Sequence, residues 1–125
     1  SEWIYPINSI KKAGGRITGG SDWTVSSLNP LVAMEVAVTR KEPGKKDGES
    51  LIPEEAVTLE TILNAYTLEA AYGLFLDDKI GSIEVGKLAD IVVLDRNLFK
   101  IPKHEIHSAK VNQTIFNGKI VYEKD

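Results

Sequence analysis

The spacing of the apolar residues changes near Ile80, and this change limits the folds open to the chain more than any other feature. Before that point, apolar side chains recur every three or four residues, which is typical of helices with one buried face. After it, short apolar runs are separated by glycine and asparagine, which is typical of strands joined by turns. We therefore expect an α+β chain in which three or four helices precede a small sheet.

Proline marks the start of the first two expected helices. Pro6 suits the first turn of a short helix that ends at Gly14. Pro30 opens a second helix directly after Asn29, and apolar residues continue at helical spacing to Arg40. The second helix should therefore have a well-defined apolar face.

A polar segment, residues 41–50, follows the second helix. It contains no large apolar residue, so we expect a mobile surface loop that nothing holds to the core. Beyond this loop, Thr58 and Thr67 are candidate caps for two further helices in series. The apolar spacing places four residues on the inner face of the second of these: Leu68, Ala71, Tyr72 and Phe75.

Three runs in the C-terminal third predict strands. Residues 91–94, Ile-Val-Val-Leu, form a continuous apolar run of the kind found in strands buried on both faces. Residues 111–116 and 119–122 are rich in β-formers, and Asn117-Gly118 between them is the pair that best fits a type I′ turn. The chain should end in a β-hairpin.

Composition argues against several classes of partner. A net charge of −3 leaves no excess of basic residues for a phosphate backbone or an anionic membrane, so we expect neither nucleic acid nor membrane as a partner. The absence of cysteine excludes disulfides and thiolate sites. We expect a soluble, cytoplasmic chain. Its start at Ser1 instead of methionine indicates an expressed segment, a processed product or a proteolytic remnant.

Asp22 is the strongest candidate for a catalytic residue. It follows a brief β-prone run, residues 16–18, and the pair Gly19-Gly20, and a helix is expected soon after it. Barrels of alternating strands and helices place catalytic carboxylates just past the carboxyl end of a strand. The same local pattern also fits an aspartate that caps a helix or closes an Asx turn, and on local pattern alone this is the commoner case.

His104 and His107 are three residues apart, a spacing that can place both imidazoles on one helical face and chelate zinc. A metal site needs three or four converging ligands, and the chain has no other histidine and no cysteine. Pro102 and Lys103 beside them are typical of exposed turns. We therefore expect a solvated surface turn here.

Three stretches of the chain resemble the amidohydrolase superfamily, in particular its branch of long metal-dependent hydrolases that includes exoenzyme-regulatory proteins. The most specific is the pattern Gly-Ser-x-Glu-x-Gly-Lys-x-Ala-Asp, which begins at Gly81. With the end of the chain, the resemblance covers nearly its whole length. The first stretch comprises residues 19–23, 29–31 and 37–40, the second residues 59–71 and the third residues 79–95, and the end of the chain adds residues 117–122.

This resemblance implies a fold and a chemistry. Residues 1–78 would be the C-terminal part of a (β/α)8 TIM barrel, with its last strand and helices, and residues 79–125 the C-terminal part of a composite β-sandwich. One or two divalent metals, with zinc expected, would supply a hydroxide that hydrolyses carbon–nitrogen bonds in a small-molecule substrate. Asp22 matches the aspartate that ligates or faces the metal, orients the water and protonates the leaving group. Trp23 would line the substrate pocket.

The chain also departs from the family pattern. The His-x-His pair, the bridging ligand and the later-strand histidines have no counterpart, and one carboxylate cannot hold a catalytic metal. We therefore expect no bound metal and no turnover by this chain alone, and the remainder of the barrel as its partner. Uncovered strand edges favour a homo-oligomer. The alternative is a stand-alone, non-catalytic interaction or regulatory module derived from such an enzyme.

Overall fold

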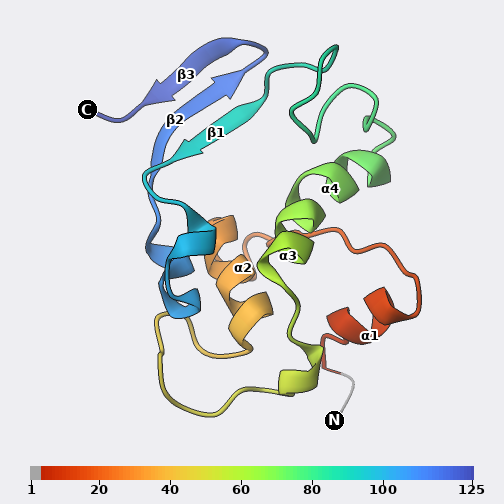
Figure 1. Ribbon diagram of the computed structural model, residues 1–125, viewed down its shortest axis with the longest axis vertical. Helices are drawn as coiled ribbons and strands as arrows, with labels where there is room; N and C mark the ends of the chain where they lie inside the picture. Colours follow the sequence, from red (N-terminus) through yellow and green to blue (C-terminus); the bar gives the residue numbers. More distant parts are fainter. Residues whose placement is uncertain (1–3) are drawn as a thin grey trace.

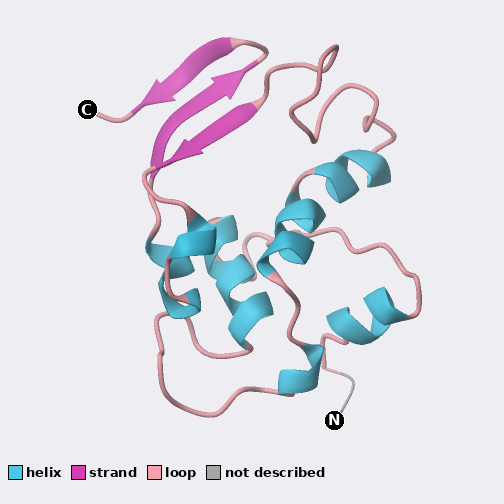
Figure 2. Cartoon of the chain, viewed as in Figure 1, coloured by secondary structure: helices cyan, strands magenta, loops and turns pink. Residues whose placement is uncertain are grey.

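The computed structural model describes residues 4–125, so the expectation about Ser1 lies outside the described residues. Helices occupy one end of the molecule and a three-stranded antiparallel sheet the other (Figures 1 and 2), which confirms the α+β prediction. The helical part contains α1 (Ile7–Lys12), α2 (Pro30–Thr39), the 3-10 helix η1 (Pro53–Glu55), α3 (Leu59–Tyr66) and α4 (Leu68–Gly73). The rest contains β1 (Ile91–Leu94), η2 (Leu98–Lys100), η3 (Lys103–Ser108), β2 (Val111–Phe116) and β3 (Lys119–Glu123).

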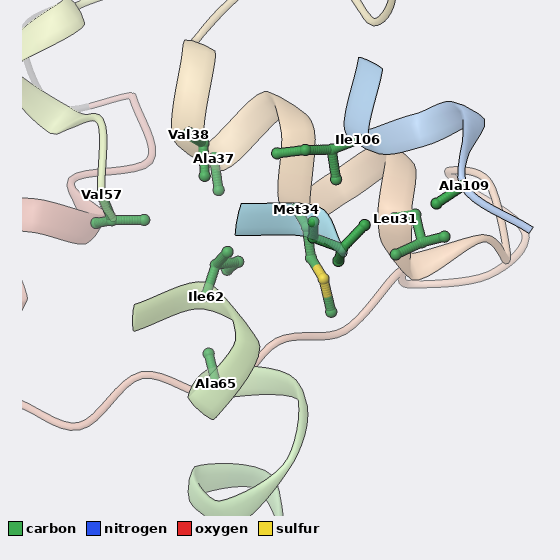
Figure 3. Packing of buried hydrophobic residues seen from close by; sticks show 10 residues of the cluster. Leu31, Met34, Ala37, Val38, Val57, Ile62, Ala65, Ile106 and Ala109 are labelled. Carbon is green, nitrogen blue, oxygen red and sulfur yellow. The ribbon is translucent and has the colours of Figure 1, made fainter. Parts of the chain in front are cut away.

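The core lies where α2 packs against α3 and η3. Apolar side chains from all three elements meet there, and Ile106 of η3 is only 1% exposed (Figure 3). The start of α2 is fixed as predicted, because Asn29 Oδ1 accepts a hydrogen bond of 3.0 Å from the Leu31 N–H. Helix α2 therefore begins where the sequence predicts, but the prediction of a well-defined apolar face is wrong, because apolar residues lie all round the helix and Glu35 is buried with them.

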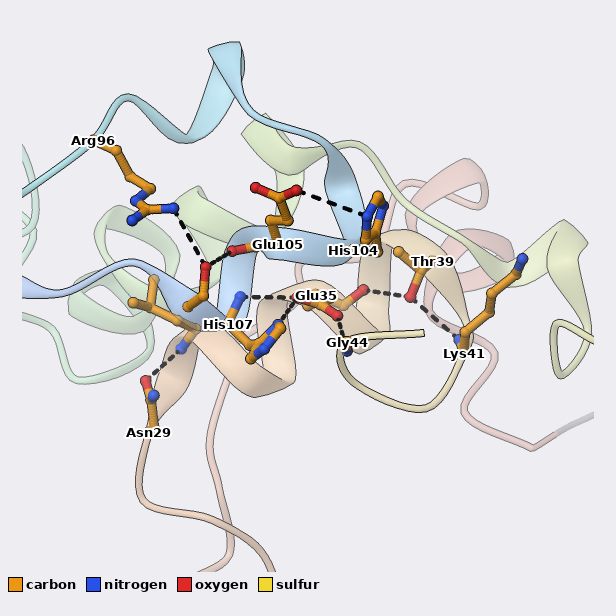
Figure 4. Close-up of polar contacts among 11 residues, drawn as sticks. Asn29, Glu35, Thr39, Lys41, Gly44, Arg96, His104, Glu105 and His107 are labelled. Atoms are coloured by element: carbon orange, nitrogen blue, oxygen red, sulfur yellow. Dashed lines mark hydrogen bonds and ion pairs between the residues drawn. The ribbon is translucent and has the colours of Figure 1, made fainter. Parts of the chain in front are cut away.

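Glu35 of α2 is buried beside this core, with 1% of its surface exposed. One carboxylate oxygen accepts a 2.6 Å hydrogen bond from the Gly44 N–H. The other lies 2.8 Å from the His107 N–H and 2.7 Å from its Nδ1 (Figure 4). The prediction that nothing holds residues 41–50 is therefore wrong, because Gly44 is bound to a buried charge. The expectation of a solvated turn is also wrong for His107, because its N–H and its ring both contact the buried Glu35 carboxylate.

Arg40 ends α2 and ties two distant segments to it. It adopts a left-handed conformation with φ of 56° and is 5% exposed. Its guanidinium donates hydrogen bonds of 2.9 Å to the carbonyls of Ile4 and Leu51. Nearby, the Glu55 carboxylate accepts a 2.9 Å hydrogen bond from the N–H of Ser9 in α1. Buried charges thus connect the Ile4 and Leu51 segments to the end of α2, and α1 to η1.

The sheet has the order β1-β2-β3, and its hairpin turn is of the predicted kind, with positive φ at Asn117 (48°) and Gly118 (75°). The prediction that β1 is buried on both faces is wrong, since Val92 is 54% exposed. Strand β1 is an edge strand, and no layer of described residues covers its outer face. Val92 and Val93 of β1 therefore remain exposed, whereas Leu94 packs partly against the core.

Two further predictions fail because the partners they need are missing. Residues 16–18 form no strand, since no neighbouring strand lies beside them to supply a hydrogen-bonded ladder. Tyr72 and Phe75 are 45% and 89% exposed instead of lying on an inner face, because α4 ends at Gly73 and packs on one side only. Among residues 4–125, no helix combines the length and apolar character needed to cross a membrane.

Thr58 and Thr67 make different bonds, and this difference is testable. Thr58 Oγ1 caps α3 by accepting a 3.2 Å bond from the Thr61 N–H, whereas Thr67 makes no cap and donates to the Leu63 carbonyl at 2.8 Å. We expect Thr58→Ala to lower the free energy of unfolding by about 1 kcal/mol and Thr67→Ala by less than about 0.5 kcal/mol. Equal losses in urea unfolding would contradict this assignment.

The Glu35 contacts predict a pH effect. Burial alone raises the pKa of Glu35, but the N–H groups of Gly44 and His107 and the His107 ring together hold it below the ordinary 4.5. The stability that Glu35 contributes is then complete above pH 4.5 and is lost as the pH falls through its lower folded pKa. Glu35→Gln should cost about 2 kcal/mol at pH 7.

The measurement is urea unfolding of the wild type and Glu35→Gln between pH 3 and pH 7. The difference between the two proteins should shrink as the pH falls, because protonation removes the same charge in the wild type. Glu105→Gln is the matched control in η3, since the Glu105 side chain is 45% exposed and lies 3.9 Å from His104. A constant difference at all pH values would contradict the role of the charge.

Candidate functional site

Asp22 lies in an exposed loop between residues 16–19 and α2. Its φ is +49°, and its carbonyl accepts a 2.7 Å hydrogen bond from the Val25 N–H. Hydrogen bonds in this loop join Ser26 to the carbonyl of Ser21, and no hydrogen bond to the Asp22 carboxylate occurs among residues 4–125. Asn29 is the residue that caps α2. Asp22 is therefore neither a helix cap nor an Asx-turn residue in this chain.

Trp23 shares the loop and is 62% exposed. Val25 and Leu28 are also exposed, so the loop presents an unusually apolar surface beside the carboxylate. The structure thus brings together the two residues singled out from the sequence. It does not enclose them, since both side chains are exposed.

A segment that leads into this loop holds it against the helices. Arg16 pairs with Glu69 of α4 at 3.2 Å, and its guanidinium lies 3.6 Å from the centre of the Tyr72 ring. Three residues later, the Gly19 N–H donates a 2.8 Å hydrogen bond to the carbonyl of Ala65 in α3. The loop that carries Asp22 therefore starts from a fixed point on the α3 and α4 surface.

An apolar cleft of about 620 Å³ separates the helices from the sheet. It is lined mainly by apolar side chains of α2, α3, α4 and β1. Asp90 also lies on its wall, where its carboxylate accepts a 2.7 Å hydrogen bond from the Asn117 N–H and so holds the hairpin. Asp22 does not line this cleft, which therefore lacks the candidate catalytic group.

The two histidines do not form a metal site. His107 Nδ1 is engaged by Glu35 at 2.7 Å, and His104 Nε2 lies 3.9 Å from a Glu105 oxygen. Within the described part of the chain, no three His, Cys, Asp or Glu side chains cluster as metal ligands would. Asp22 offers one carboxylate, so the residues of this chain do not complete the site that a catalytic metal requires.

The role of Glu35 was missed at the level of sequence. It stands beside Met34 in a helix whose other residues are apolar except for Thr39, and a charged residue in such a helix must find buried partners. The charge of Glu35 within an apolar helix therefore indicates a buried hydrogen-bonded carboxylate. Its partner His107 is 72 residues away, however, so the pair itself could not be read from local spacing.

Comparison with known proteins identifies the family. The sequence model of the Amidohydrolase family matches residues 1–122. The chain belongs to this family. It is 36% identical to the protein LONG AFTER FAR-RED 3 of Arabidopsis thaliana, over 94% of the chain and 20% of the relative. It is 33% identical to the N-substituted formamide deformylase of Arthrobacter pascens, over 97% of the chain and 22% of that protein.

A solved structure supports the fold of this amidohydrolase chain. The crystal structure of an amidohydrolase from Thermotoga maritima MSB8 superposes with a TM-score of 0.69 and 24% sequence identity. The match covers 94% of the chain and 26% of that structure. The chain thus spans about a fifth of the curated relatives it matches and about a quarter of the solved one.

Asp22 and Asn29 provide a paired test of the site. Because the Asp22 carboxylate accepts no hydrogen bond from residues 4–125, Asp22→Asn, which keeps a side chain that tolerates the positive φ, should change the free energy of unfolding by less than about 0.5 kcal/mol. Asn29→Ala removes the cap of α2 and should cost about 1 kcal/mol. Urea unfolding of both variants checks this, and a loss at Asp22 equal to that at Asn29 would restore the capping interpretation.

Proposed function

We propose that this chain is the C-terminal part of a longer metal-dependent amidohydrolase that cleaves non-peptide carbon–nitrogen bonds. The family match over residues 1–122 supports the class of enzyme. The relative named N-substituted formamide deformylase supports an amide as the bond, and N-substituted formamides as the first substrates to try. The 20% and 22% coverage of the relatives supports a longer parent protein.

The observation that carries the proposal is that the Asp22 carboxylate accepts no hydrogen bond from residues 4–125 and lies in an exposed loop that also presents Trp23 and Val25. A carboxylate that stabilises nothing in the fold is free to act on a substrate. In the proposed reaction, Asp22 takes a proton from the attacking water and returns it to the leaving nitrogen. Trp23, one residue away and 62% exposed, packs on the apolar part of the substrate.

The metal is proposed to be zinc, with Asp22 as one of its ligands. Because a catalytic zinc site uses several protein ligands, the others would lie in the part of the protein outside this chain. The isolated chain is accordingly proposed to be inactive, and the complete protein to be cytoplasmic.

The partner proposed for this chain is the rest of the same polypeptide. In this proposal residues 1–78 complete a barrel and residues 79–125 a β-sandwich. The apolar cleft of about 620 Å³ and the exposed edge strand β1 are surfaces that such a partner would cover. The same surfaces also support the second candidate, a non-catalytic module that associates with another copy of itself.

The test uses the complete product of the gene that encodes this chain. We expect it to release formate from N-alkyl or N-aryl formamides, and Asp22→Asn to lower kcat by at least about 100-fold. Asp47→Asn, in the exposed loop of residues 41–50, is the matched control and should retain full activity. Asp22→Asn with wild-type kcat, or robust hydrolysis by the 125-residue chain alone, would contradict the proposal.

A further inference from the structure

Residues 16–19, which we call the tether, lie along the outer surface of α3 and α4. Arg16 contacts Glu69 and Tyr72 of α4, as described above. The methyl group of Thr18 lies 3.4 Å from where a Cβ on Gly73 would stand. The tether is therefore attached to the helices along its length, although it pairs with no strand in the described part of the chain.

Gly19 makes the closest of these contacts. A Cβ added to Gly19 would lie 2.3 Å from Cε2 and 2.4 Å from Cδ2 of the Tyr66 ring, and separations this short are not tolerated. The Gly19 N–H is held at the same point by the carbonyl of Ala65. Burial raises the pKa of the Tyr66 hydroxyl, which agrees with a ring enclosed by its neighbours. Only glycine fits between the loop and this ring.

Gly20 provides an internal contrast. A Cβ added there would meet no heavy atom within 4 Å. Two adjacent glycines of the same motif thus differ completely in their surroundings. The steric requirement belongs to Gly19 and to its contact with Tyr66, and not to the flexibility of the glycine pair as a whole.

We propose that Ala65 and Tyr66, at the C-terminal end of α3, are positioning residues that set the place of the Asp22 carboxylate by docking Gly19. Asp22 lies three positions after Gly19, and an extended chain of that length reaches at most about 11 Å. Fixing Gly19 therefore confines Asp22 to a small region. This inference rests on the proposed function, because it assumes that the position of Asp22 matters for the reaction.

The position of the Asp22 carboxylate affects the rate of proton transfer in the proposed reaction. A carboxylate must lie within hydrogen-bond reach of the proton it moves, and displacement by about 1 Å can cost roughly 100-fold in rate. Adding a methyl group at Gly19 forces the tether away from the Tyr66 ring by a shift of at least this order, because carbon atoms in contact prefer about 3.5 to 4.0 Å. The Asp22 side chain moves with it while remaining chemically intact.

The experiment compares variants of the complete gene product, with N-substituted formamides as substrates. We expect Gly19→Ala to lower kcat by roughly 10- to 100-fold with KM changed less than about twofold, and Gly20→Ala to behave as wild type. The double variant Gly19→Ala/Tyr66→Ala should recover at least part of the lost kcat, because the smaller side chain removes the clash. Urea unfolding of the same variants separates displacement of Asp22 from a purely destabilising effect, which would lower the free energy of unfolding of Gly19→Ala and leave kcat of the folded protein unchanged.

Hydrogen exchange of residues 19–28 in the same proteins separates the two levels of the proposal. We expect faster exchange in Gly19→Ala than in Gly20→Ala, independent of any activity. If Gly19→Ala exchanges and turns over as the wild type does while Asp22→Asn is inactive, the positioning role is overturned and the proposed function stands. If Asp22→Asn is fully active, the proposed function fails, and with it the catalytic meaning of the tether.

Discussion

The buried carboxylate of Glu35 is the interaction on which the helical part of this chain depends. A charge that is 1% exposed is costly unless its oxygens are bonded, and here they accept from Gly44 and from two nitrogens of His107. These bonds join α2 to the long loop before η1 and to η3 beyond β1. Arg40, five residues later and just past the end of α2, does the same for the N-terminal segment through the Ile4 carbonyl. The apolar core lies beside these hydrogen bonds of Glu35 and Arg40.

The elements that could be predicted from sequence are those whose causes are local. Asn29-Pro30, Thr58 and Asn117-Gly118 carry their own capping or turn chemistry, and each appears where predicted. The failures share a different cause. Residues 16–18 needed a neighbouring strand and β1 needed a second covering layer, and the described residues supply neither.

At the candidate site, too, local features could be predicted from sequence and contacts with distant residues could not. The position of Asp22 after a glycine pair was readable from sequence, but the absence of any partner for its carboxylate was not. That absence removes the capping interpretation and leaves a residue with no structural task. The chain belongs to the amidohydrolase family, and its unfinished surfaces agree with a segment that spans about a fifth of its relatives. The apolar cleft of about 620 Å³ does not contain Asp22, and we propose it as a surface that the rest of a larger protein covers.

The central claim is that this chain is one part of a larger metalloenzyme. The most direct measurement is intact-mass spectrometry, with metal analysis, of the natural product of the complete gene. The account predicts a protein several times heavier than 13.7 kDa that contains zinc. A natural product of 13.7 kDa without metal would contradict it and would direct attention to binding partners instead of substrates.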